Sequence, residues 1–420
     1  MNKYIILLII IIFVSVFLLT GCYDSREIEE LAYVLAMGID EGTDNKYRIT
    51  VQFPTLEGAP GSEEDNDTGE EGYTTISFEA PSFAAGIDIA NAFLPRSLNF
   101  MHTKFIIISD ELAKKDISEL IMSLVRYREI RKTANVIIAE DSAEDFLKEN
   151  KTTIGTTLSK TMELLMNGSF NTGYFPNATL HDFHNSIHSN YEQSIAIKGA
   201  VNELTNNEED NDNDNDNSND NDYKGRINTG GKYVAGEIPR EGGSKIELFG
   251  TTVFKWSNKV GELTGDETRI LLITRGEFQK GIFAIKDLDE HDCDCTISLE
   301  IHQEKKPDIS VSFKDGQPNI RLDILLEGEL AAVDSMKDYS TPEEKDHVEK
   351  AFENFIKRET YKLFDKCKDM EADIFRFGTI VAKKFNTIQE WEDYNWLNKF
   401  RNSEIDVNVK FYIRRTGNII

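Results

Sequence analysis

Cysteines and basic side chains are scarce in this 420-residue sequence. Four cysteines cannot supply the dense disulfide framework of small secreted domains, so hydrophobic cores must hold the chain together. Lys and Arg total 47 against 74 Asp and Glu, and the net charge of −27 repels nucleic-acid phosphates. Because no basic stripe offsets this charge, we expect no nucleic-acid partner.

The sequence motifs that indicate common catalytic sites are also missing. There is no G-x-S-x-G elbow, no G-x-x-x-x-G-K-[ST] phosphate loop, no H-E-x-x-H and no G-x-G-x-x-G after a strand. We therefore expect a protein that is not an enzyme and needs no cofactor.

Long apolar runs are confined to the N-terminus. Lys3 is the only charge before the run from Tyr4 to Leu19, which leads into Leu19-Thr20-Gly21-Cys22. The pattern is typical of a secretory signal, and the tetrapeptide resembles a bacterial lipobox. This resemblance implies that residues 1–21 are removed between Gly21 and Cys22 and that Cys22 is lipidated. An uncleaved transmembrane anchor is the alternative, and both place residues 23–420 outside the cytoplasm.

Residues 22–200 alternate between short apolar runs and amphipathic stretches. The predicted strands are 33–39, 46–53, 74–78, 104–109 and 135–139, and the predicted helices are 82–94, 117–125, 142–148 and 154–166. The turn-rich segment 41–45 suits a hairpin loop between the first two strands. This order predicts a mixed α/β domain whose sheet is covered by helices.

An acidic linker or insertion, 201–244, follows this domain. Eight of its residues between Glu208 and Asp222 are acidic and none is basic, so this tract cannot bury a core and should be solvated. Asp210, Asp212 and Asp214 fit the first ligand positions of an EF-hand, but Asn215 replaces the turn glycine, and we expect no calcium site.

The remaining chain divides into a small middle region, 245–290, and a C-terminal mixed α/β domain, 291–420. In the middle region, 248–256 reads as a strand and 258–261 as a turn. In the C-terminal domain, alternate residues of 293–301, 320–326 and 405–413 are apolar, as in half-buried strands. Thr341-Pro342-Glu343-Glu344 has the form of a capping box, and it begins a long amphipathic helix that reaches Cys367. The predicted fold class is α/β of the mixed (α+β) kind, with several domains and mixed sheets covered by helices.

Two sets of residues resemble metal ligands in isolation. His181, His184 and His188 could share a helical face, but nearby glycine, proline and asparagine argue against a firm helix, so we expect surface histidines. His291, Cys293 and Cys295 form the second set. Since both cysteines are in register with a buried strand face, core packing explains them better than a metal does.

Two further expectations concern the cysteine and tryptophan side chains. A disulfide from Cys293 or Cys295 to Cys367 stays open, because it depends on a distance that the sequence does not give. Trp256, Trp391 and Trp396 lie in otherwise apolar patterns, and we expect all of them in the core.

Several short stretches, in order along the chain, resemble the Ger(x)C family, the lipoprotein C subunits of spore nutrient-germinant receptors. The stretches are Gly21-Cys22-Tyr23-Asp24-Ser25-Arg26-Glu27-Ile28, Ala36-Met37-Gly38-Ile39-Asp40, Leu94-Pro95-Arg96, His102-Thr103-Lys104, Ile106 to Ser109, Arg128-Glu129-Ile130-Arg131, Gly261-Glu262-Leu263-Thr264-Gly265-Asp266-Glu267-Thr268, Asp373-Ile374-Phe375, Phe377-Gly378 and Trp396. Departures are Tyr23, where the family commonly has Trp, and the Asn/Asp tract.

The resemblance implies three mixed α/β domains, no enzymatic activity and a lipid anchor on the outer face of the spore inner membrane. It also implies two integral-membrane partners, an A-type subunit with a large soluble head and a permease-like B-type subunit. The competing hypothesis is an extracytoplasmic solute-binding lipoprotein, although the chain shows no clear repeat of two similar lobes.

Overall fold

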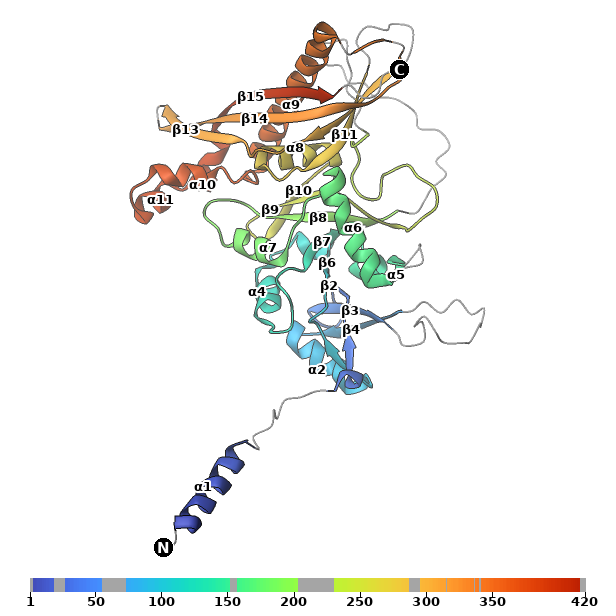
Figure 1. The fold of residues 1–420 in the computed structure, drawn as a ribbon, viewed down its shortest axis with the longest axis vertical. Coiled ribbons are helices and arrows are strands. Elements are labelled where there is room, and N and C mark those ends of the chain that lie inside the picture. Colours follow the sequence, from blue (N-terminus) through green and yellow to red (C-terminus); the bar gives the residue numbers. More distant parts are fainter. Residues whose placement is uncertain are drawn as a thin grey trace.

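Two large sheets and the helices packed on them make up most of the molecule (Figure 1). The computed structural model describes residues 3–18, 27–54, 73–151, 157–202, 230–286, 295–314, 316–335, 337–339 and 341–415. The fold is mixed α/β, as predicted. No helix within these ranges, α1 (Lys3–Leu18) included, combines the length and apolarity that crossing a membrane requires.

The first sheet has eight strands in the order β10-β9-β8-β7-β6-β2-β3-β4. The strands are β2 (Ala36–Glu41), β3 (Tyr47–Pro54), β4 (Tyr73–Ala80), β6 (Phe105–Ser109), β7 (Asn135–Ala139), β8 (Ile195–Val201), β9 (Ile246–Lys255) and β10 (Asn258–Leu263). The four central strands, β8, β7, β6 and β2, are parallel, and antiparallel strands extend both sides.

Helices cover both faces of this sheet, which explains why β6 and β7 are buried throughout. One face packs against α2 (Phe83–Phe93), α3 (Asp110–Ala113), α4 (Ser118–Arg126) and α7 (Leu180–Ile187), and the other against α5 (Ala143–Glu149) and α6 (Leu158–Thr172). A separate parallel pair, β1 (Leu31–Tyr33) and β5 (Ser97–Asn99), lies beside the first of these layers.

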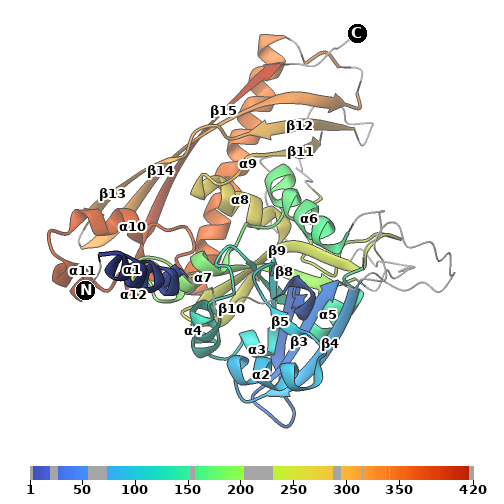
Figure 2. The ribbon, with the colours of Figure 1, turned by 60° about the horizontal axis from the view of Figure 1, so that its bottom comes forward.

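The second sheet has five strands. They are β11 (Lys280–Lys286), β12 (Thr296–His302), β13 (Asp308–Lys314), β14 (Gln317–Val333) and β15 (Glu404–Arg415). Alternate residues of β12 and β14 are buried, so one face packs on the core and the other meets solvent. The long helix α9 (Pro342–Asp369) covers the buried face and runs alongside β15 (Figure 2).

Short helices complete the C-terminal region. They are α10 (Gly378–Val381), α11 (Ile388–Tyr394) and α12 (Trp396–Lys399), with 3₁₀ turns η3 (Ala382–Lys384) and η4 (Phe400–Asn402); a further 3₁₀ turn, η1 (Ile28–Glu30), precedes β1.

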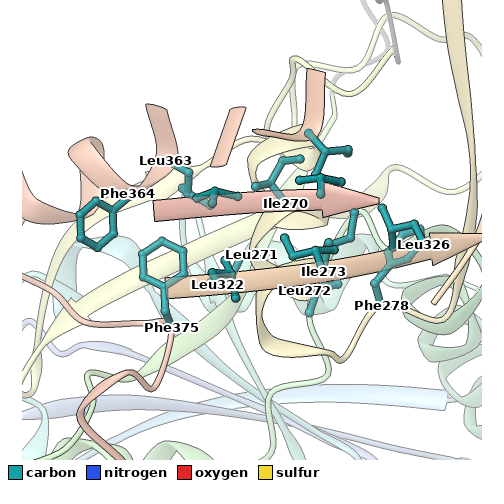
Figure 3. Packing of buried hydrophobic residues seen from close by; sticks show 14 of the residues in the cluster. Ile270, Leu271, Leu272, Ile273, Phe278, Leu322, Leu326, Leu363, Phe364 and Phe375 are labelled. Carbon is teal, nitrogen blue, oxygen red and sulfur yellow. The ribbon is translucent and has the colours of Figure 1, made fainter. Parts of the chain in front are cut away.

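Helix α8 (Gly265–Arg275) joins the two sheets into one core. Its four consecutive apolar residues, Ile270 to Ile273, are all buried, which requires packing partners around the whole helix. Figure 3 shows them among Leu322 and Leu326 of β14, Leu363 and Phe364 of α9, and Phe375. The same cluster includes Val253 and Leu263 of the first sheet. The two sheets therefore share apolar contacts through α8.

Most predicted strands and helices are confirmed, with shifts of a few residues at their ends. The predicted turn at 258–261 is wrong, because these residues belong to β10 and the chain turns at Trp256 and Ser257. Segment 245–290 does not form a sheet of its own. Strands β9 and β10 complete the first sheet, β11 starts the second, and α8 lies between them.

Replacing Leu271 by alanine tests this shared core. Leu271 is 0% exposed, so Leu271→Ala removes buried contacts and leaves a cavity, which should lower the free energy of unfolding by about 2–5 kcal/mol. Denaturant unfolding measures the loss, and Leu164→Ala, at a position that is 47% exposed on α6, is the matched control with little expected effect. Equal stability of the two variants would contradict a core centred on α8.

Candidate functional site

The residues predicted to be modified lie outside the described parts of the chain. These are Gly21 and Cys22 at the cleavage and lipidation site. Five other candidate ligand residues are also outside the described parts. They are Asp210, Asp212 and Asp214, which were compared with an EF-hand, and His291 and Cys293. The lipid anchor therefore stays a prediction.

Two of the three candidate histidines, His181 and His184, lie on a helix and His188 is its C-cap, contrary to the prediction that this segment is not firmly helical. Thr179 caps α7 by accepting a hydrogen bond from the Asp182 N–H, which outweighs the helix-disfavouring residues nearby. The rings of His184 and His188 meet edge to face at 5.1 Å. Burial lowers the pKa of His184, so its neutral form is favoured. Within the described residues, the acid and histidine groups close enough to hold a metal do not include these histidines.

The cysteines differ from their predicted roles. Cys367 is a free, buried thiol on α9, so the open possibility of a disulfide to Cys367 is wrong. Burial raises the pKa of this thiol well above its usual value, which leaves it unreactive. Cys295 is disulfide-bonded and only half-buried, because it precedes the first residue of β12 and falls short of the core. Core packing was therefore the wrong prediction for Cys295.

A buried cluster of charges lies where β7, β8 and β10 of the first sheet meet α3. Lys198 is completely buried, and its Nζ contacts Glu262 Oε1 at 2.5 Å and the Glu140 carboxylate. Lys259 bridges Glu262 to the buried Asp110. Every one of these ammonium groups thus meets a carboxylate, as buried charges require.

The electrostatics of this cluster indicate a structural role. Burial lowers the pKa of Lys198, whereas for Glu262 burial is outweighed by hydrogen bonds from Lys198 and Lys259 and the pKa is lowered. The Asp110, Glu140 and Glu262 oxygens are close enough to hold a metal ion, but the two lysines already engage them. The cluster links the middle of β8 to β10 and to Glu140, which directly follows β7.

The stretch Gly261 to Thr268 continues from this cluster into α8. Thr264 accepts a hydrogen bond from the Glu267 N–H, and the Glu267 carboxylate accepts one from the Thr264 N–H, which forms a reciprocal capping box. Glu267 also forms an ion pair with Lys366 of α9, with 2.7 Å between Glu267 Oε2 and Lys366 Nζ. These residues therefore start α8 and tie it to α9.

Asp373 is the centre of a second buried polar site. Its carboxylate accepts hydrogen bonds from the backbone N–H groups of Phe375, Phe377 and Gly378 and from the indole Nε1–H of Trp396, at 2.8 to 3.3 Å. Burial raises its pKa to about 6, against the lowering effect of these donors. One carboxylate thus fixes the loop between α9 and α10 and orients Trp396.

This loop also contacts the segment that leads into β8 of the first sheet. The Asp373 carbonyl accepts from the Gln193 N–H at 2.8 Å, and Arg376 forms ion pairs with Glu192 and Glu277 at 2.7 and 2.6 Å. A Cβ on Gly378 would stand 2.0 Å from the Tyr191 carbonyl oxygen, so only glycine fits this approach.

Sequence reasoning found some of these residues and missed others. Asp373 and Gly378 were named only through the family resemblance, and nothing in the sequence indicated that they contact Trp396. Lys198 was missed, although a lone lysine within the apolar run Ile195–Val201 is a signal of a buried, paired charge. Trp391 and Trp396 are buried as predicted, but Trp256 is 44% exposed, so its predicted core position is wrong.

Comparison with known proteins identifies relatives for both halves of the chain. A model of the spore germination protein N-terminal domain matches residues 24–198, and one of the spore germination B3/GerAC-like C-terminal domain matches residues 249–417. Spore germination protein KC of Bacillus subtilis (strain 168) is 24% identical over 420 residues, 98% of this chain and 96% of that protein.

Two further proteins are similar over most of their length. Spore germination protein B3 of the same organism is 22% identical over 418 residues, 97% of each chain. The crystal structure of the GerBC protein has 16% sequence identity and a TM-score of 0.49, over 93% of this chain and 100% of that one.

Removal of the Asp373 carboxylate should destabilise the protein strongly. Asp373→Ala leaves its four buried donors without an acceptor, and we expect a loss of about 3–5 kcal/mol in the free energy of unfolding. Asp373→Asn keeps an acceptor oxygen and the same shape without the charge, so it should cost less at pH 7. Denaturant unfolding compares the two, and an equal loss would contradict this account.

Stability should also depend on pH through Asp373. Because the folded-state pKa of about 6 exceeds the usual 3.8, the folded protein binds this proton more tightly than the unfolded chain. The contribution of this raised pKa to the free energy of unfolding is complete below about pH 4. It is lost as the pH rises through 6, at up to about 1.4 kcal/mol per pH unit. Denaturant unfolding of the wild-type protein and of Asp373→Asn at several pH values between 7 and 4 gives the difference between their free energies of unfolding, and this difference should change with pH. A constant difference would contradict the raised pKa.

Proposed function

Because the chain belongs to the Ger(x)C family of spore germination proteins, we propose that it is a non-catalytic subunit of a spore nutrient-germinant receptor. The observation that carries this proposal is the match of both family domains, in order, together with relatives named as spore germination proteins over nearly their full length. The subunit supports assembly of the receptor, and two integral-membrane subunits, an A-type and a permease-like B-type, are its partners.

The contacts of the buried charges support a non-catalytic role. Catalytic acids and bases must be able to reach a substrate. In the described parts of the chain, Lys198 and Lys259 are each held by carboxylates, and Asp373 is enclosed by donors of its own loop. These groups stabilise junctions between elements, as expected of a subunit that holds a shape for its partners.

The architecture does not favour the alternative of a two-lobed solute-binding lipoprotein. Such proteins bind between two similarly built lobes, whereas here an eight-stranded sheet with helices on both faces adjoins a five-stranded sheet with one solvent-facing side. The two halves also share one core through α8. Hinged closure of independent lobes would have to break these contacts.

Lipid at Cys22 would give the subunit its position. Acyl chains contribute about 0.8 kcal/mol for each buried CH₂, and more than one chain is needed for stable attachment. Attachment to the outer face of the spore inner membrane confines the folded part to a thin layer. This confinement raises its effective concentration for membrane-embedded partners without requiring a large interface.

Replacing Cys22 tests the anchor. Cys22→Ala removes the thiol that takes the lipid, and we expect loss of acylation, release of protein from spore membranes and impaired nutrient-triggered germination. Intact mass, membrane fractionation and germination assays measure these effects. Cys367→Ala, which removes the buried free thiol, is the control and should keep the anchor. Normal germination with unchanged membrane retention in Cys22→Ala spores would refute the anchoring role.

A further inference from the structure

All three tryptophans of the chain line a single pocket of about 200 Å³. Trp256 comes from the β9–β10 loop of the first sheet, Trp391 from α11 and Trp396 from α12. Polar side chains complete the wall. They are Asn190, Glu392 and Asn395, and Leu397 is the remaining wall residue. Indole rings from distant parts of the sequence thus converge where the two sheets' regions meet.

The backbone of Trp256 is strained. Its φ is +56°, a left-handed conformation that is unfavourable for a non-glycine residue, and a short hairpin loop usually places glycine there. Gln193 Oε1 accepts from the Trp256 N–H at 2.5 Å and holds this conformation. Burial does not explain the strain, since the ring is 44% exposed. Asn395, on the same pocket, also has positive φ, at 53°, but it is the C-cap of α11, where asparagine commonly takes this conformation. Such strain is concentrated at functional sites.

Trp391 carries an unused hydrogen-bond donor. The residue is only 4% exposed, its ring stacks on Tyr191 at 5.2 Å, and its buried Nε1–H has no acceptor among the described residues. The Trp396 indole differs, since it donates to Asp373. This N–H is itself buried from solvent, so a ligand would reach it only if neighbouring side chains moved, and the exposed ring of Trp256 is the aromatic surface that a ligand can contact.

We propose that this pocket, which we call the tryptophan pocket, binds one neutral, polyhydroxylated sugar ring. The exposed Trp256 face can pack against the apolar C–H face of such a ring, as aromatic side chains do with apolar surfaces. Asn190, Asn395 and Glu392 supply the donors and acceptors that ring hydroxyls need.

Charge and size separate this ligand class from others. The pocket wall contains no Lys or Arg to balance a carboxylate, which disfavours amino acids. A simple cation would suit Glu392 and the indole faces but makes no use of the amide N–H groups of Asn190 and Asn395. The volume is below the roughly 300–1,000 Å³ of drug-sized sites, which fits a single ring. A free monosaccharide and the terminal ring of a longer glycan offer the same chemistry.

The three indole N–H signals provide a direct test with the full-length protein in detergent. In ¹⁵N-labelled protein they give one resonance per tryptophan, assigned by Trp256→Ala and Trp391→Phe. The probes are glucose, N-acetylglucosamine and its trimer, with choline as the cation and alanine as the zwitterion. We expect a sugar to move the Trp391 and Trp256 resonances saturably. Binding of the trimer without the monosaccharides would identify a glycan end as the source.

Variants then separate binding from folding. Trp256→Ala should weaken sugar affinity at least tenfold, while Ile388→Ala, exposed on α11 outside the pocket wall, should leave it unchanged. Trp256→Gly should abolish binding without lowering the melting temperature, because glycine accepts positive φ without strain. The proposal is overturned if no sugar moves an indole resonance, if choline or alanine binds instead, or if sugar affinity survives both tryptophan changes. These outcomes are independent of the anchoring and receptor roles proposed above.

Discussion

The continuous core around α8 is the constraint on which the rest of the structure depends. A helix that is buried all round must be supplied with partners from every direction, and this chain recruits them from both sheets and from α9. Arg269 extends the junction: it is 2% exposed, its guanidinium lies 3.6 Å from the centre of the Tyr174 ring, and it donates to the Thr172 and Ile282 carbonyls. Burial lowers the pKa of Arg269. The Tyr174 ring and the two carbonyl acceptors stabilise the buried guanidinium. The halves of the molecule are therefore fixed relative to each other.

Buried polar groups specify how the elements around this core meet. The Lys198 cluster links β8 to β10 in the first sheet, and Glu267 and Lys366 join α8 to α9. Asp373 fixes the loop that contacts the segment just before β8. Several of these residues belong to the stretches by which the sequence resembles its family. Their motifs thus correspond to contacts between elements, which agrees with a subunit whose task is to present a defined shape.

The sequence predicted local structure well where one periodicity dominated. The alternation in 320–326 and 405–413 and the capping residues around Thr341 correspond to β14, β15 and α9. It failed where the decisive interaction is distant or atypical. The β9–β10 turn was not predicted because a tryptophan, rather than glycine, has the positive φ there. A cap at Thr179 stabilises α7 despite poor helix formers. No local pattern shows that β9 pairs with β8. Convergence of three tryptophans separated by up to 140 positions is likewise invisible before the chain is folded.

In the proposed account, an N-terminal anchor, the two-sheet body and membrane-embedded partners form one receptor. Its central claim is tested most directly by purifying the native protein from spore membranes and identifying its companions and its N-terminus by mass spectrometry. The account predicts an acylated N-terminal Cys22 and two integral-membrane proteins recovered in constant proportion to the chain. A protein that is recovered alone, with residues 1–21 attached and a bare thiol at Cys22, would contradict it.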